Sequence, residues 1–377
     1  MKVTVAIDSL KGSLTSKEAG EAVKRGIIEA IPDAEVYVRP IADGGEGTAQ
    51  AIVEALDGTY REITVSDPLK RPVKASYGII GNCAVIEISA AAGITLISSD
   101  EKNPLFTTTY GVGEMIKDAI SLGIREFIIG LGGSATNDGG AGMLMALGFD
   151  MCDKDGKSIG FGAKGLSSLY SVNAENALPE LSDCKFRIAC DVTNPLCGEN
   201  GCSAVFAPQK GADSAMIKDM DLWLSSYADI TKKLLPYADK NAAGAGAAGG
   251  LGFAFLSYLG AKLEHGIDLI IEKTRLSEYI KDSDIVVTGE GRLDSQTVMG
   301  KTPVGVAELA KKHGKTVIAF AGCVTDDATV CNSHGIDAFF PIVRGAVSLE
   351  DAMDTENAKK NMLSAARQVF RLIKSIE

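Results

Sequence analysis

Short apolar runs alternate with helix-spaced apolar residues in the N-terminal part of the chain. Residues 3–7 form an uncharged apolar run that predicts a buried strand, and residues 35–39 predict a second strand. Between them, Thr15 and Glu18 have the spacing of a capping box, and apolar residues recur at helical spacing over residues 19–31. Because strands alternate with helices, we expect a parallel sheet with right-handed crossovers.

The same alternation returns in the C-terminal part of the chain. Residues 285–287 (Ile-Val-Val) are β-branched and uncharged, which is typical of a buried parallel strand. Thr302 is the expected N-cap of the helix that follows, with Pro303 at its first position and Gly314 after its end. The remaining predicted elements are strands at residues 269–271, 316–320 and 338–340 and an amphipathic helix over residues 355–376.

The hydrophobic pattern changes between residues 60 and 88. Three short strands are predicted at residues 61–65, 73–80 and 84–88, and no helical pattern separates them. Strands joined only by turns favour antiparallel pairing. We therefore expect an α/β protein with two domains, with a boundary near Ser66 and a return to the first domain before Ile285.

Composition and charge exclude several classes of protein. The net charge of −11 argues against nucleic acid as the main partner. The eight cysteines contain no C-x2-C pair, which favours reduced thiols and a cytoplasmic location over a zinc site. Residues 241–261 are uncharged but rich in glycine and alanine, so we expect a buried turn and helix rather than a membrane span.

A glycine loop with two carboxylates follows the predicted strand at 285–287. It reads Thr-Gly-Glu-Gly-Arg-Leu-Asp and contains Glu290 and Asp294. A strand, a glycine loop and a helix N-terminus together present backbone N–H groups to an anion. Ser295 occupies the place of the first glycine of a Walker A motif, so this is not a P-loop. The two carboxylates indicate a divalent cation between the loop and a phosphate group.

Four further segments combine a predicted strand end with polar side chains. The glycine-rich loop at 130–142 is the strongest of these anion-cradle candidates. Asp191 lies at the carboxyl end of a strand predicted at 185–189, where open α/β sheets place their chemistry. The pairs Asp8 and Lys11, and Asp43 and Glu46, occupy the other two loops. A G-x-G-x-x-G match at 244–249 does not follow a buried strand, which excludes a dinucleotide site.

In these loops the sequence resembles the bacterial glycerate kinase family, and the matching motifs span nearly the whole chain in family order. The matching segments lie at residues 8–13, 42–48, 130–140, 190–196, 246–250 and 288–294. The resemblance implies a flavodoxin-like parallel-sheet domain (residues 1–66 plus 282–377) with a mixed α/β domain (residues 67–281) inserted into it. It also implies ATP-dependent phosphorylation of D-glycerate, with Mg²⁺ as cofactor and 2-phosphoglycerate as product.

We assign roles on the requirements of phosphoryl transfer. Asp191 is the expected base, and Asn194 helps to orient the substrate. Lys11 and Arg292 are the expected catalytic cations, and Arg71 is a weaker candidate for the substrate carboxylate. Glu290 and Asp294 are the expected metal ligands, with Asp43 and Glu46 as second choices. The remaining residues expected to bind substrate or phosphate are Asp8, Ser9, Gly132, Gly133, Ser134, Thr136, Asn137 and Asp138.

Two alternatives stay open at this point. One is a kinase of another small hydroxy acid, and the other is a non-catalytic protein that binds a nucleotide or metabolite. The phosphorylated hydroxyl, the domain that holds the adenine and the oligomeric state, including a homo-oligomer, are equally open. No membrane partner is expected.

Overall fold

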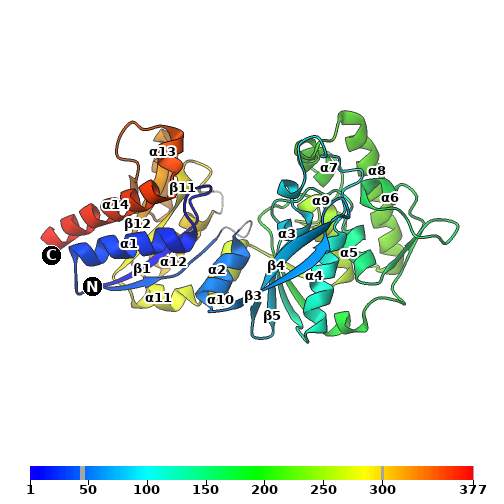
Figure 1. Ribbon diagram of the computed structural model, residues 1–377, viewed down its shortest axis with the longest axis horizontal. Helices are drawn as coiled ribbons and strands as arrows, with labels where there is room; N and C mark the ends of the chain where they lie inside the picture. The colour runs from blue at the N-terminus through cyan, green and yellow to red at the C-terminus, as the bar shows by residue number, and fades with distance from the viewer. Residues whose placement is uncertain (43–46, 299–300, 377) are drawn as a thin grey trace. The chain divides into compact units, whose positions relative to one another are not determined.

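The chain folds into two compact units, which the computed structural model describes for residues 1–42, 47–298 and 301–376 (Figure 1). Unit 1 comprises Met1–Asp43, Gln50–Asp57 and Ile267–Glu377. Unit 2 comprises Gly44–Ala49 and Gly58–Gly266. Both ends of the chain belong to unit 1, so unit 2 interrupts it in the sequence.

Unit 1 is built on a parallel five-stranded sheet. Its strands are β1 (Lys2–Ile7), β2 (Glu35–Val38), β11 (Ile285–Leu293), β12 (Thr316–Val324) and β13 (Ala338–Pro341). They lie in the order β2-β1-β11-β12-β13, and every neighbouring pair is parallel. This is the order of flavodoxin-like sheets, in which the strand order reverses beside the first strand and leaves a crevice at the carboxyl ends. The predicted α/β class and its flavodoxin-like part are confirmed.

Helices cover both faces of this sheet. On one face, α1 (Ser16–Ala30) and α14 (Thr355–Ile376) lie side by side, and their buried residues share a core with β1 and β11 (Figure 1). The predicted capping box of α1 is confirmed, because Glu18 N donates to Thr15 Oγ1 and Thr15 N donates to Glu18 Oε2. The other helices assigned mainly to unit 1 are α2 (Thr48–Ala55), α10 (Gly266–Lys273), α11 (Leu276–Asp282), α12 (Thr302–Lys312) and α13 (Leu349–Met353).

Unit 2 contains a mixed six-stranded sheet. Its strands are β3 (Thr59–Ser66), β4 (Pro72–Ile80), β5 (Cys83–Glu87), β6 (Glu126–Gly130), β9 (Lys185–Ala189) and β10 (Lys262–Glu264). They lie in the order β10-β9-β6-β5-β4-β3. The pairs from β3 to β5 are antiparallel, as predicted, whereas β5, β6, β9 and β10 are parallel. A separate hairpin joins β7 (Asp150–Cys152) and β8 (Ser171–Asn173).

The helices of unit 2 enclose a second hydrophobic core. They are α3 (Ser89–Ala92), α4 (Tyr110–Ser121), α5 (Ala141–Ala146), α6 (Gly162–Leu166), α7 (Cys202–Phe206), α8 (Ser214–Leu234) and α9 (Ala247–Tyr258). Phe127 and Phe186 stack with ring centroids 4.8 Å apart in this core. Asp213 caps α8 by accepting hydrogen bonds from Ala215 N and Met216 N. Within the described residues, no helix is both long and apolar enough to span a bilayer.

Several local predictions differ from the structure. The strand β11 continues through Glu290 and Arg292 to Leu293, because its whole length pairs with β12, so these residues lie in a strand rather than a loop. Lys301, not Thr302, is the N-cap of α12. The strand predicted at 269–271 is part of the helix α10.

Apart from the short segment Gly44–Ala49, the units divide the chain at 57/58 and 266/267, whereas the sequence predicts boundaries at 66/67 and 281/282. One strand pairing and one helix packing account for the difference. The strand β3 pairs along its length with β4, so it belongs to the sheet of unit 2. The helix α11 packs against α12 and β1, so it belongs to unit 1.

Candidate functional site

A pocket of about 570 Å³ lies at the carboxyl ends of the strands of unit 1. We call it the acidic pocket. Its polar and charged lining residues come from the segment after β1, from β11, and from the segment between β11 and α12; they are Asp8, Ser9, Lys11, Ser13, Glu290, Arg292, Asp294, Gln296 and Lys301. Leu349 and Met353 of α13 are part of its apolar wall. Six of the predicted site residues therefore line one pocket, at the position expected for a ligand in an open α/β sheet.

Two carboxylates in the acidic pocket surround one cationic group. The Nζ atom of Lys301 lies 3.8 Å from Glu290 Oε2 and 4.0 Å from Asp294 Oδ1. The two acidic side chains are only 13% and 16% exposed. Thr297 Oγ1 donates to Glu290 Oε1 over 2.7 Å, and Arg292 Nε lies 3.3 Å from Asp294 Oδ2. The carboxylates are thus held in place with oxygens that face a common point.

Asp8 joins the end of β1 to the first turn of α12. Its carboxylate accepts from Ser9 N over 2.6 Å and from Thr302 Oγ1 over 3.2 Å. Asp8 is buried, whereas the nearby Lys11 is exposed. The end of β1 therefore supplies a fixed carboxylate and an exposed amine to the same pocket.

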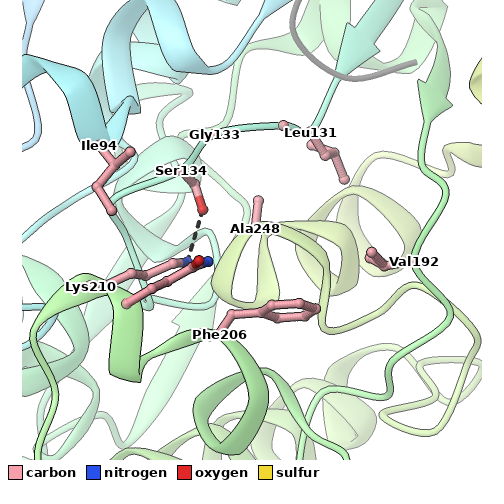
Figure 2. A pocket seen from close by; sticks show the side chains of 10 residues that line it. Ile94, Leu131, Gly133, Ser134, Val192, Phe206, Lys210 and Ala248 are labelled. Carbon is pink, nitrogen blue, oxygen red and sulfur yellow. Dashed lines mark hydrogen bonds between the residues drawn. The ribbon is translucent and has the colours of Figure 1, made fainter. Parts of the chain in front are cut away.

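A second pocket, of about 360 Å³, lies within unit 2 (Figure 2). We call it the glycine-loop pocket. It is lined by Gly132, Gly133 and Ser134 from the loop after β6, by Ala248 at the start of α9, and by Ile94, Leu131, Val192, Phe206, Gln209 and Lys210. Three of the predicted site residues lie here. Gly249 must be glycine, because its φ is +69° and a Cβ atom would lie 2.0 Å from the carbonyl oxygen of Thr136.

Lys210 is a buried cation in this pocket that the sequence analysis did not select. It ends the 3₁₀ turn Pro208–Lys210 and is 2% exposed. Its Nζ donates to Ser134 Oγ over 2.9 Å and to the carbonyl oxygen of Thr136 over 2.6 Å. Burial removes the ammonium from water and lowers the pKa of Lys210 to about 8. A lone lysine between Gln209 and Gly211 carries no signal of this burial in the sequence.

The side chains of Thr136, Asn137 and Asp138 are fully buried beneath the glycine loop. Asp138 accepts hydrogen bonds from the backbone N–H groups of Thr109, Gly140 and Gly142 and from hydroxyl groups at the start of α4. Burial raises the pKa of Asp138, and these hydrogen bonds oppose that effect. Asp138 therefore ties the loop to α4. Asn137 Nδ2 donates to Ser203 Oγ over 2.9 Å.

Asp191 and Asn194 lie in the segment after β9. Asp191 Oδ1 accepts from Gly266 N over 3.1 Å and lies 3.3 Å from His265 Nδ1. Its side chain is 38% exposed, so a ligand has access to it. Asn194 Nδ2 donates to the carbonyl oxygen of Asn200 over 2.9 Å. The adjacent Val192 lines the glycine-loop pocket.

Eight predicted residues are not among the described residues that line either pocket: the five just placed, Thr136, Asn137, Asp138, Asp191 and Asn194, and the three that follow. Arg71 forms ion pairs instead with Asp67 over 2.7 Å and with Glu101 over 2.6 Å, so its guanidinium group is bound by carboxylates of the chain itself. Asp43 and Glu46 lie outside the described residues.

Comparisons with known proteins agree on one family. The sequence model of the "Glycerate kinase family" matches residues 3–374. The chain is 47% identical over 371 residues to "Glycerate 2-kinase" of Escherichia coli (strain K12), covering 98% of this chain and 97% of that protein. It is 47% identical over 376 residues to "Glycerate kinase" of Bacillus subtilis (strain 168), covering 99% and 98%.

A solved structure agrees with the sequence relatives. This structure, "Crystal structure of putative glycerate kinase 2 from Salmonella typhimurium LT2", matches with a TM-score of 0.92 and 44% identity. The match covers 100% of this chain and 98% of that one. Since the family model and these relatives span almost its whole length, the chain belongs to the glycerate kinase family.

Proposed function

We propose that the protein is an ATP-dependent glycerate kinase, which transfers a phosphoryl group from Mg-ATP to D-glycerate and forms 2-phosphoglycerate. The substrate is proposed from the relatives, which are named glycerate kinases and which the chain matches over nearly their full length. The position of the transferred group follows from the relative that is named "Glycerate 2-kinase". The observation that carries the reaction class is the pair Glu290 and Asp294, two largely buried carboxylates that face one cationic group.

This carboxylate pair fits a Mg²⁺ ion that is shared with a nucleotide. Mg²⁺ in phosphoryl transfer is usually bound by one or two carboxylates, with substrate phosphates and water as its other ligands. Within the described residues, no group of three or more His, Cys, Asp or Glu side chains is arranged to hold a metal alone. Glu290 and Asp294 would therefore hold the ion, which when bound neutralises charge on the phosphates.

The other residues of the acidic pocket suit the same ligand. Lys11 and Arg292 line the pocket and supply positive charge for phosphate oxygens. Asp8 is fixed by Ser9 N and by Thr302 Oγ1, so it keeps the end of β1 in position beside the start of α12. We assign the phosphate groups of ATP to this pocket.

Asp191 is the proposed base for the glycerate hydroxyl. Its carboxylate is oriented by Gly266 N and His265 Nδ1, and it remains partly exposed to a ligand. A carboxylate in this position accepts the hydroxyl proton as the phosphoryl group is transferred. Asn194 lies in the same segment and is proposed to help orient the substrate.

The function is tested by measuring ADP release with Mg-ATP and D-glycerate, followed by ³¹P NMR of the product. We expect ADP release that depends on D-glycerate, 2-phosphoglycerate as product, and no turnover with glycerol, which lacks the carboxylate. Formation of 3-phosphoglycerate would reject the proposed position of transfer. If another hydroxy acid is used in preference to D-glycerate, the substrate assignment fails. ATP binding without turnover of any acid would favour a binding protein.

A further inference from the structure

The glycine-loop pocket contains a positive charge that makes no direct ion pair with an Asp or Glu of the described chain, although the buried Asp138 interacts with it electrostatically. Lys210 has three N–H donors, and two of them bind neutral acceptors, Ser134 Oγ and the carbonyl oxygen of Thr136. No ion pair joins Lys210 to any described residue, and no described Asp or Glu lines the pocket. Because a buried ammonium without a carboxylate in direct contact is costly, the pocket favours an anion.

Backbone N–H groups of the glycine loop add to this preference. Gly132, Gly133 and Ser134 line the pocket, and their N–H groups make no hydrogen bond to another described residue. Gly133 has a φ of +69°, which turns the loop in a way that favours glycine. Successive backbone N–H groups around a concave turn bind anions in many proteins. Lys210 and these three loop residues thus line the same pocket.

The size and walls of the pocket indicate which anion it suits. Figure 2 shows the Nζ end of Lys210 beneath Ser134, with Phe206, Ala248, Val192 and Leu131 around the remaining space. The pocket of about 360 Å³ is small, and Lys210 is the single cation among its described lining residues. One ammonium balances one carboxylate, whereas a nucleotide triphosphate carries several charges. Apolar walls suit the carbon chain of a small acid.

We propose that Lys210, Ser134 and the backbone of Gly132 and Gly133 bind the carboxylate of D-glycerate, an assignment that rests on the proposed function. Lys210 is then the residue that distinguishes glycerate from neutral polyols. The site differs from the acidic pocket, whose carboxylates would repel the substrate's own carboxylate in the absence of a metal.

The test compares D-glycerate with its methyl ester, which keeps both hydroxyl groups but has no charge. Calorimetric titrations use the wild-type protein, Lys210→Met and the control Lys164→Met, in which an exposed lysine of unit 2 is neutralised. All titrations contain Mg²⁺ and a non-hydrolysable ATP analogue, and the binding of that analogue is measured separately. We expect Lys210→Met to weaken D-glycerate binding by roughly 10- to 100-fold, which is the effect of losing a hydrogen bond to a charged group. Binding of the ester and of the ATP analogue should not change.

The outcomes separate this proposal from the proposed function. Equal D-glycerate affinity in a folded Lys210→Met protein would overturn the carboxylate site. Weaker binding of the ATP analogue, with D-glycerate unaffected, would assign the ammonium to a nucleotide phosphate instead and also overturn it. Wild-type binding of D-glycerate that is lost in the variant, but without ADP release, supports the site and rejects the kinase. Absence of wild-type D-glycerate binding overturns both.

A wild-type measurement makes the test independent of variant folding. The ammonium of Lys210 is charged below a pH of about 8, and the titratable groups that interact with it are Asp138 and Cys202. Burial raises the pKa of the Cys202 thiol to about 12, so that thiol stays neutral over the tested range. D-glycerate affinity should therefore be constant below pH 8 and fall about 10-fold per pH unit above it. The same fall for the methyl ester, or a constant affinity up to pH 9.5, would overturn the proposal.

Discussion

Replacing Asp138 by alanine tests whether this carboxylate anchors the glycine loop. The substitution removes the acceptor for three buried backbone N–H groups, those of Thr109, Gly140 and Gly142. Each buried donor left without a partner costs about 1–3 kcal/mol. The free energy of unfolding of unit 2 should therefore fall by about 3–9 kcal/mol, toward the lower value if water enters the space.

Asp138→Asn should lower the free energy of unfolding less than Asp138→Ala, because the two carboxylate oxygens accept different numbers of hydrogen bonds. Oδ2 accepts from Thr109 N, Thr109 Oγ1, Thr108 Oγ1 and Gly142 N, whereas Oδ1 accepts from Gly140 N. An amide with its oxygen at the Oδ2 position keeps all but the Gly140 bond. We expect a loss of about 1–3 kcal/mol, the cost of one unsatisfied buried donor.

Urea unfolding followed by tryptophan fluorescence measures these effects in the relevant unit. The protein has a single tryptophan, Trp223, and it lies in α8 of unit 2. Asp213→Ala is the control, because Asp213 caps α8 from an exposed position and its removal should cost about 1 kcal/mol. If Asp138→Ala costs no more than this control, Asp138 is not an anchor. Normal stability with lost substrate binding would instead favour the predicted role of Asp138 as a ligand-binding residue.

Three further substitutions test the site and the glycine loop. Asp191→Asn should lower kcat roughly 100-fold or more with an unchanged melting temperature, since a general base contributes about that much; near-normal turnover would remove Asp191 as the base. Glu290→Gln should raise the Mg²⁺ concentration that gives half-maximal activity, because one carboxylate ligand is lost; an unchanged metal titration would exclude ligation. Gly142→Ala places a Cβ atom 2.0 Å from Thr108 Oγ1 and should lower the free energy of unfolding by about 1–3 kcal/mol, whereas Gly160→Ala meets no atom within 4 Å and should be neutral; equal stabilities would contradict the packing argument.

Strands and helix ends could be predicted where the properties of neighbouring residues determine them. Residues 3–7 and 285–287 are uncharged and, apart from Ala6, β-branched, and they form the centre of the parallel sheet of unit 1. The Thr15 and Glu18 capping box needs only four consecutive residues, and it is present. The antiparallel strands of unit 2 follow from the short connections between them.

The candidate site was less predictable, because tertiary contacts decide which way its side chains point. The 130–142 loop was recognised by its glycines, yet Ser134 faces the pocket and Asp138 lies beneath the loop. Lys210 is buried by contacts with Ser134 and Thr136, which lie 76 and 74 residues away in the sequence. A pattern of neighbouring residues carries no information on such distant contacts. Arg71 is likewise predicted from its charge alone, but its guanidinium group forms ion pairs with Asp67 and Glu101.

The order of the strands in unit 1 has a consequence for the synthesis of the protein on the ribosome. The first strand, β1, pairs with β11, and Lys2 N donates to Asp284 Oδ2 across 282 residues. At about 5–20 residues per second, β1 leaves the ribosome roughly 14–56 s before this partner exists. Residues 58–266 are complete during that interval. We therefore expect unit 2 to fold during translation. The apolar strand β1 stays without its partner β11 during this time, and we expect chaperones to protect it from aggregation.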